Sequence, residues 1–134
     1  MAVHYSIQGE GDTLTVNAWG FDESLAQVEE YGMAVISACI EGGYTHVLCN
    51  EVGSSIVSAR PTPYEDAAFM SAHAPRVARV AIVCNPKFIA DARFFEDVAI
   101  NRRLTVRVFK EVEDASWWLN DSATAERLRT VESI

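Results

Sequence analysis

The sequence lacks the features that would indicate a membrane protein or a nucleic-acid-binding protein. Its longest apolar runs, over residues 33–40 and 77–84, are far shorter than the roughly 20 residues that a membrane-spanning helix needs. Positive charge is scarce, since 11 Lys and Arg stand against 19 Asp and Glu, and the formal net charge of −8 repels phosphate backbones and anionic lipid. The first residues also lack the basic and apolar segments of a secretion signal. We therefore expect a cytoplasmic protein with no membrane span and no nucleic-acid partner.

Cysteine is also scarce, and its pattern does not indicate a disulfide framework or a metal site. Cys39, Cys49 and Cys84 are an odd, widely spaced set without a C-x-x-C pair, and none of the three histidines lies at ligand spacing from them. Each cysteine stands among apolar residues, where a free thiol packs as a small hydrophobic group. The sequence therefore predicts three buried, reduced thiols, with no metal and no other cofactor.

The common catalytic motifs are missing as well. The sequence has no G-x-S-x-G elbow, no P-loop, no G-x-G-x-x-G and no H-E-x-x-H. A nucleophile and base built from Cys49 and His46 would lie on opposite faces of a strand, because side chains three residues apart alternate. We therefore predict that the protein is not an enzyme. A small hydrolase with an unrecognised arrangement of Cys49, His46 or Glu51 is kept as an alternative.

What the sequence does contain is one globular domain with alternating strands and helices. The chain has 134 residues, of which 49% are hydrophobic and 22% charged, which suits a single ordinary core. Two β-prone segments over residues 4–8 and 13–19 flank a glycine-containing loop and predict an antiparallel hairpin. The apolar stripe that follows predicts a helix ending at Gly42 and Gly43.

The second half of the chain repeats a strand-then-helix pattern. Apolar segments predict strands over residues 44–52, 77–84 and 104–109. Thr62-Pro63 and Asn85-Pro86 each place a capping side chain before proline and predict the starts of two helices, and a short helix is expected over 112–119. Strands separated by helices predict parallel neighbours joined by crossovers. The predicted fold is α/β, a mixed sheet with an N-terminal antiparallel hairpin and about four helices, in the order β-β-α-β-α-β-α-β-α.

The last residues of the chain form a tail. Leu128, Val131 and Ile134 recur at helical spacing, so residues 121–134 are predicted to be helical and residues 1–120 to form the domain. Such a stripe could dock on its own domain or meet a second subunit in a homodimer.

One stretch of the sequence resembles a known family. Residues 95–109, which read FEDVAINRRLTVRVF, are followed by Ala115 and Trp118-Leu119. They are similar to the C-terminal signature of SpoIIAA-like proteins, the STAS/CRAL-TRIO-like group, whose members often read FAE-VA-NRG--VRVF and end in a helix with A--WL. Arg103 stands where relatives commonly have glycine. The resemblance implies a bacterial STAS-like domain with a binding or regulatory role and no agreed enzymatic activity.

The resemblance also bears on a possible phosphorylation site. STAS domains that act as anti-sigma-factor antagonists carry a phosphorylatable serine in an Asp-Ser-Ser-Gly turn after the third strand. The corresponding region here, residues 50–55, contains Ser54-Ser55 but lacks the following glycine.

The segment from Asn50 to Tyr64 is the predicted functional site. In open α/β sheets, ligands bind beyond the carboxyl ends of parallel strands, where helix N-termini offer free N–H groups. A regulatory partner protein or a small anionic or lipid-like ligand is expected to bind there. The candidate residues are Asn50, Glu51, Ser54, Ser55, Arg60, Thr62, Tyr64 and Lys87.

A second hypothesis is a lipid-binding module. Its apolar cavity would lie between the sheet and the helices over residues 25–40 and 88–99, and Trp19 and Trp117 could flank an apolar groove.

Overall fold

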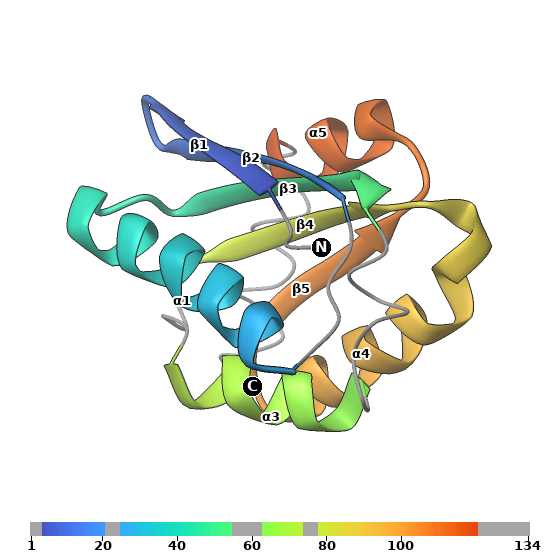
Figure 1. The fold of residues 1–134 in the computed structure, drawn as a ribbon. Helices are drawn as coiled ribbons and strands as arrows, with labels where there is room; N and C mark the ends of the chain where they lie inside the picture. The colour runs from blue at the N-terminus through green and yellow to red at the C-terminus, as the bar shows by residue number, and fades with distance from the viewer. Residues whose placement is uncertain (1–3, 21–24, 55–62, 74–77, 121–134) are drawn as a thin grey trace, which may run out of the picture.

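The computed structural model describes residues 4–20, 25–54, 63–73 and 78–120, and Figure 1 shows their arrangement. Strands and helices alternate along the chain in the predicted order. The elements are β1 (His4–Glu10), β2 (Thr13–Gly20), α1 (Leu25–Gly42), β3 (His46–Ser54), α3 (Pro63–His73), β4 (Arg79–Cys84), the 3-10 helix η1 (Pro86–Phe88), α4 (Ile89–Asn101), β5 (Thr105–Phe109) and α5 (Val112–Asn120). The predicted helical tail over residues 121–134 lies outside the described residues.

The strands form one mixed five-stranded sheet in the order β1-β2-β3-β4-β5. β1 and β2 pair antiparallel, and every following pair is parallel, as predicted. The register aligns Val16 with Cys49, Cys49 with Ile82 and Ile82 with Val108, so apolar side chains of four strands share one face. This alignment places the largest part of the core on that face.

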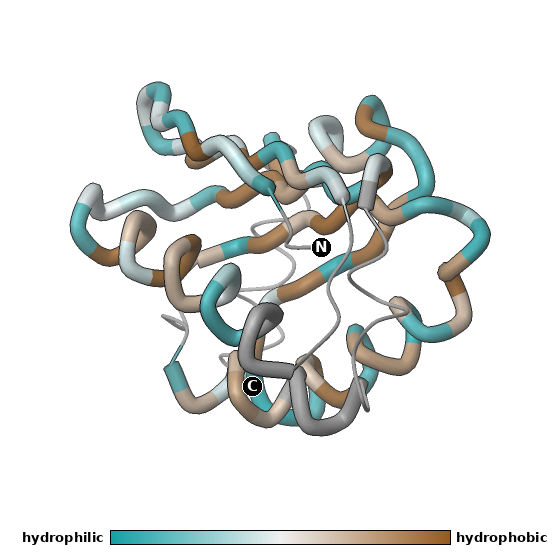
Figure 2. The backbone as a smooth tube through the Cα atoms, viewed as in Figure 1, coloured by the Kyte–Doolittle hydropathy of each residue, from teal (hydrophilic) through white to brown (hydrophobic). Residues whose placement is uncertain are grey.

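Helices cover the two faces of the sheet unequally. α1, α3 and α4 lie on one side and α5 lies on the other (Figure 1). The main core fills the space between the sheet and the three helices, whereas a smaller cluster of Ala81, Val83, Ala115, Trp118 and Leu119 lies beneath α5. Figure 2 shows apolar residues concentrated along the central strands, while the tip of the β1–β2 hairpin is hydrophilic.

The hairpin is longer and its turn tighter than the sequence pattern predicts. β1 continues to Glu10 and β2 begins at Thr13, so the turn consists of Gly11 and Asp12 alone. Gly11 has φ of 60°, a left-handed conformation that glycine adopts without steric cost and that two-residue hairpins require. Predicting the glycine-containing segment 9–12 as loop therefore ended the first strand two residues too early.

β3 also runs further than predicted. It begins at His46 and continues to Ser54, because Trp19 and Gly20 of β2 pair with Gly53 and Ser54 past an irregularity in the register. The first part of the predicted binding loop is therefore strand. Cross-strand pairing with β2, which no local pattern reveals, extends it.

The helix predicted at Asn85-Pro86 begins with a different local structure. Asn85 is the N-cap, and its side chain accepts a hydrogen bond from the Lys87 N–H at 3.0 Å, but it caps the 3-10 helix η1. The α-helix α4 starts only at Ile89. The prediction that Asn85-Pro86 starts a helix is confirmed. The helix that begins there is a 3-10 helix, and the predicted α-helix begins three residues later.

α4 ends in a motif that normally uses glycine. The Arg103 N–H bonds to the Ile100 carbonyl at 2.9 Å and the Leu104 N–H to the Ala99 carbonyl at 3.0 Å, which is the Schellman pattern of a helix C-terminus. Arg103 holds the left-handed position with φ of 72°. The backbone conformation that glycine would adopt easily is thus kept by an arginine, at a steric cost.

Candidate functional site

The carboxyl ends of β3 and β4 meet at a rim organised by two asparagine side chains. Asn85 donates a hydrogen bond from Nδ2 to the Val52 carbonyl at 3.5 Å and accepts one at Oδ1 from Lys87. The Oδ1 atom of Asn50 accepts a hydrogen bond from the Val52 N–H at 3.3 Å. These contacts tie the end of β3 to the start of η1. We call Asn50, Val52, Asn85 and Lys87 the rim.

The rim presents one cationic and one apolar side chain to solvent. Lys87 is exposed, and its Nζ lies 5.8 Å from the centre of the Phe88 ring. Val52 is 38% exposed.

Glu51 does not belong to the exposed site that the sequence predicts. Its side chain points into the main core and is only 4% exposed. The Tyr31 hydroxyl, itself buried on α1, donates a hydrogen bond to Glu51 Oε2 at 3.0 Å. Because residues 47, 49 and 51 share the face covered by helices, the alternation of β3 sends this carboxylate inward.

The structure describes two of the other predicted site residues that lie between residues 54 and 64. Ser54 is the last residue of β3 and Tyr64 lies in the first turn of α3. Ser55, Arg60 and Thr62 fall outside the described residues. Among the described candidates, the structure brings Asn50 and Lys87 into the same rim and separates Glu51 from them by burial.

An apolar cavity of about 70 Å³ lies within the main core. It is bounded by three strands of the sheet and by α1, α3 and α4, which includes both helices that the lipid-binding hypothesis names. Among the described residues that line it, Glu51 alone has an acidic or basic side chain. The lining residues are Tyr31, Gly32, Val35, Ile36, Cys39, Val47, Cys49, Glu51, Met70, Ala78, Val80, Ile82, Phe95, Leu104, Thr105 and Val106.

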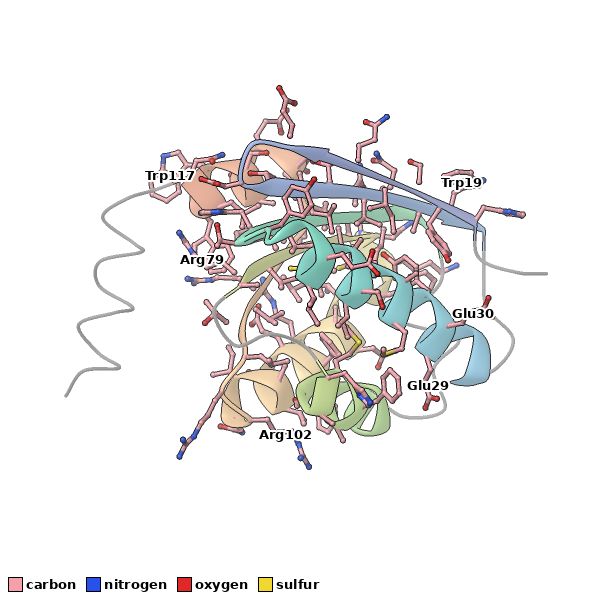
Figure 3. The ribbon with its side chains drawn as sticks, turned by 90° about the vertical axis from the view of Figure 1, so that its left-hand side faces the viewer. Trp19, Glu29, Glu30, Arg79, Arg102 and Trp117 are labelled. Atoms are coloured by element: carbon pink, nitrogen blue, oxygen red, sulfur yellow. The ribbon has the colours of Figure 1, made fainter. Side chains whose placement is uncertain are left out.

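Trp19 and Trp117 do not frame a common groove. Figure 3 shows them at opposite sides of the molecule, Trp19 on β2 and Trp117 on α5, and neither lines the cavity. The prediction of an apolar groove between them is therefore wrong. The sequence pattern missed Met70 of α3 and Val106 of β5, because their contribution to the cavity depends on packing between distant segments.

The three thiols are buried and reduced, as predicted. Burial raises the pKa of the Cys39 thiol, which donates a hydrogen bond to the Tyr44 carbonyl at 3.2 Å. Burial raises the pKa of Cys84 too, and the negative charge of nearby Glu51 raises it further. Thiols held in the protonated form are poor nucleophiles.

The arrangement also gives the hydrolase alternative little support. His46 shares a 2.9 Å hydrogen bond between its Nδ1 and the Thr45 hydroxyl, whereas Cys49 is buried in the main core on the face that β3 turns toward the helices. In the described part of the chain, no group of three His, Cys, Asp or Glu side chains could hold a metal ion, and no helix there is long and apolar enough to cross a membrane.

Comparison with known proteins identifies the fold and the family. The model of the SpoIIAA-like family matches residues 22–120. No curated protein matches the sequence significantly. An anti-sigma factor antagonist from Mycobacterium paratuberculosis is similar in structure, with a TM-score of 0.63 and 11% sequence identity over 90% of this chain and 96% of that protein.

Two further solved structures share the fold. An uncharacterised protein with a SpoIIAA-like fold from Shewanella loihica has a TM-score of 0.54 and 18% identity, over 88% of this chain and 94% of that one. The anti-sigma factor antagonist SpoIIAA, in its unphosphorylated form, has a TM-score of 0.50 and 12% identity, over 94% of this chain and 98% of that one. At sequence identities of 11–18%, these similarities show a shared fold only.

Proposed function

This chain belongs to the SpoIIAA-like family, and from that premise we propose that it is a non-catalytic regulatory module that docks a partner protein. The partner would bind at the rim and the adjoining segment that leads to α3, where Ser54, Ser55, Arg60, Thr62 and Tyr64 lie in the sequence. Solved structures with the same fold are described as anti-sigma factor antagonists, which supports a role in binding another protein.

The observation that carries the proposal is the ordered, exposed rim. Asn85 is hydrogen-bonded both to β3 and to η1, so Val52 and Lys87 are presented on a backbone that is already held in place. A preorganised surface loses less conformational entropy when a partner binds. The same end of a parallel sheet is the common location of binding sites in α/β folds.

A variant of the rim tests this function directly. Val52→Asp should weaken or abolish binding of a partner captured by the wild-type chain, because it places an unpaired charge where an apolar contact is expected. Ser37→Asp, on an exposed position of α1, is the matched control and should retain the partner. Affinity capture compared across the three proteins gives the answer, and a partner bound equally by all three would refute docking at the rim.

Charge added beside the rim provides a second test. Ser54→Asp together with Ser55→Asp mimics modification at the end of β3 and should change partner binding while leaving the folding transition unaltered. Unchanged capture and an unchanged thermal transition in this double variant would remove the two serines from the site.

A second function, binding of a small apolar ligand, is favoured by the cavity. Its walls are almost entirely apolar, and a cavity of about 150 Å³ with such walls stays dry and binds benzene. At about 70 Å³ the present cavity would accept a short alkyl group, and a longer chain would require the helices to move apart. A ligand held there at a hundred times its Kd would stabilise the fold by about 2.7 kcal/mol.

Fatty acids of increasing length test this second function by thermal shift and native mass spectrometry. Val106→Phe should abolish the shift because it fills the cavity, whereas Arg107→Phe, one residue later on the exposed face of β5, should preserve it. The absence of both a copurified ligand and a thermal shift in the wild type would exclude the function.

A further inference from the structure

The two edges of the sheet differ in how their backbones are protected. At the β5 edge, the Val108 N–H donates to the Glu96 carboxylate, and the Val108 carbonyl accepts a hydrogen bond from Arg93 Nη1 at 3.2 Å. Both side chains come from α4 and also pair with each other at 3.6 Å. Side chains that occupy edge backbone groups prevent another strand from pairing there. The β5 edge is therefore blocked.

The β1 edge has no such protection. In the described part of the chain, no strand pairs with the outer side of β1 and no side chain hydrogen-bonds to its backbone. All seven residues are exposed except Ile7, which is partly buried. The strand contains no lysine, no proline and no irregularity in its pairing with β2, which are the usual devices that discourage edge pairing. It is thus a regular strand with a free edge.

The turn geometry decides which backbone groups face outward. In a two-residue hairpin the closing residues, here Glu10 and Thr13, exchange both of their backbone hydrogen bonds. Hydrogen-bonded and non-hydrogen-bonded pairs alternate from there along an antiparallel ladder. The N–H and carbonyl groups of Tyr5, Ile7 and Gly9 therefore point toward the free edge.

We propose that two copies of this chain pair antiparallel through their β1 strands, with the two-fold axis at Ile7, to form one continuous sheet. Ile7 would lie opposite Ile7 of the second copy, and Tyr5 opposite its Gly9. In this register the three residues with outward-facing backbone groups are the ones that pair, so each pair exchanges two hydrogen bonds. One self-complementary patch then serves both copies, as a two-fold interface requires.

The side chains of the exposed face are complementary in the same register. His4 would lie opposite the Glu10 carboxylate of the second copy, and Ser6 opposite its Gln8. Both are non-hydrogen-bonded pairs, in which cross-strand side chains approach most closely. Within one chain His4 and Glu10 lie at opposite ends of β1, so a polar contact between these two residues can arise only between copies.

On the opposite face of β1, the space over Gly9 is filled by an aromatic ring. The Tyr44 ring occupies the space where a Cβ of residue 9 would lie, so Gly9 is required there. Tyr5, which packs edge-on against Tyr31 with ring centres 5.3 Å apart, would lie across the axis from this glycine. A one-residue shift would turn every side chain to the wrong face. A two-residue shift in either direction would separate His4 from Glu10 of the second copy and leave one of these two residues beyond the partner strand. Pairing of one edge buries less than the roughly 1,200 Å² of a stable interface, so we expect a concentration-dependent dimer.

A charge exchange tests the pairing and its register. His4→Glu opposes Glu10 of the second copy with a like charge and should weaken dimerisation at least several-fold in sedimentation equilibrium. Adding Glu10→Lys places opposite charges across the axis and should recover dimerisation. Glu113→Lys, an exposed reversal on α5, should leave the dimer unchanged. A wild-type chain that remains monomeric at hundreds of micromolar, or a double variant without recovery, would overturn the proposal.

Site-directed cross-linking tests the same geometry without relying on affinity. A Ser6→Cys protein mixed with a Gln8→Cys protein should form a mixed disulfide on mild oxidation, because residues 6 and 8 face each other across the axis. Ser37→Cys mixed with Gln8→Cys is the control and should cross-link much less. Equal cross-linking in both mixtures would contradict β1 pairing, and circular dichroism of each variant confirms that the fold is kept.

Discussion

The two faces of the sheet differ in the size of their hydrophobic clusters and in the presence of a cavity. The face beneath α5 is small, with Ala81, Val83 and Ala115 fully buried. The face beneath α1, α3 and α4 is larger, and it holds the cavity, the three thiols and the buried Glu51 carboxylate. Tight packing tolerates little change in shape, whereas a cavity and a buried polar group leave room for a ligand or a rearrangement. From this difference we expect the α5 face to tolerate a change in side-chain volume less well than the three-helix face.

The helices of the two faces also end differently. At the C-terminus of α5, Arg79 of β4 donates hydrogen bonds to the carbonyls of Trp118 and Leu119 at 2.6 and 3.1 Å and lies 4.6 Å from the Trp118 ring centre (Figure 3). α4 ends instead in the left-handed Arg103. The α5 terminus is held by a side chain from the sheet, and the α4 terminus by backbone hydrogen bonds that require a left-handed arginine.

Removal of the Trp118 ring should have the largest effect on stability. Trp118 is 5% exposed and its ring lies 5.8 Å from that of Phe109, so Trp118→Ala empties the centre of the small cluster. We expect a loss of about 3–5 kcal/mol in the free energy of unfolding measured with urea. Trp117→Ala, at a neighbouring residue that is 68% exposed, should change it by less than about 0.5 kcal/mol. Similar losses in both variants would contradict the central position of Trp118 in the cluster beneath α5.

Loss of the Arg79 guanidinium should have the next largest effect. Arg79→Met keeps most of the apolar stem but deprives two helix-terminal carbonyls of charged donors, which should cost about 1.5–3 kcal/mol. Arg107→Met, at an exposed position on β5, is the matched control and should be nearly neutral. Equal urea midpoints for the two variants would show that the contact with α5 contributes nothing.

A pair of identical enlargements compares the packing of the two faces. Val83→Ile adds a methylene to the filled cluster and should cost about 1–3 kcal/mol. Val106→Ile adds the same group beside the cavity and should leave stability unchanged or slightly raised, because the space is already there. Thermal denaturation of both proteins measures the difference. A larger loss of stability for Val106→Ile would show that the cavity face is packed more tightly than the α5 face.

Substitution of Arg103 at the C-terminus of α4 should have the smallest effect on stability, and it should stabilise the protein. Arg103→Gly relieves a left-handed arginine and should stabilise the protein by about 0.5 kcal/mol, since the relief exceeds the entropy that glycine adds to the unfolded chain. Arg102→Gly, where φ is −97°, gains no such relief and should destabilise by a similar amount. Urea unfolding of the two variants measures both, and destabilisation by Arg103→Gly would indicate that the arginine side chain makes a stabilising contact.

Much of the fold could be predicted from local patterns. The alternation of Leu14, Val16 and Ala18 identifies a strand with one buried face, and the Asn85-Pro86 pair identifies a helix start. The candidate site was less predictable. Asn50 and Lys87 both contribute to the rim, through hydrogen bonds to Val52 and Asn85, but Glu51 turns inward because its direction depends on which face of β3 the helices cover.

The amino-acid sequence by itself determined the order of strands and helices, the burial of the thiols and the family, because these depend on periodicity, capping and residue type along short stretches. Only the tertiary structure decided the extension of β3 to Ser54, the cavity and the hydrogen bonds from Arg79 to the end of α5. It also decided that side chains of α4 hydrogen-bond to the β5 edge of the sheet and that no described residue does so at the β1 edge. Each of these joins segments distant in the chain, and local physical chemistry does not specify which distant groups will meet.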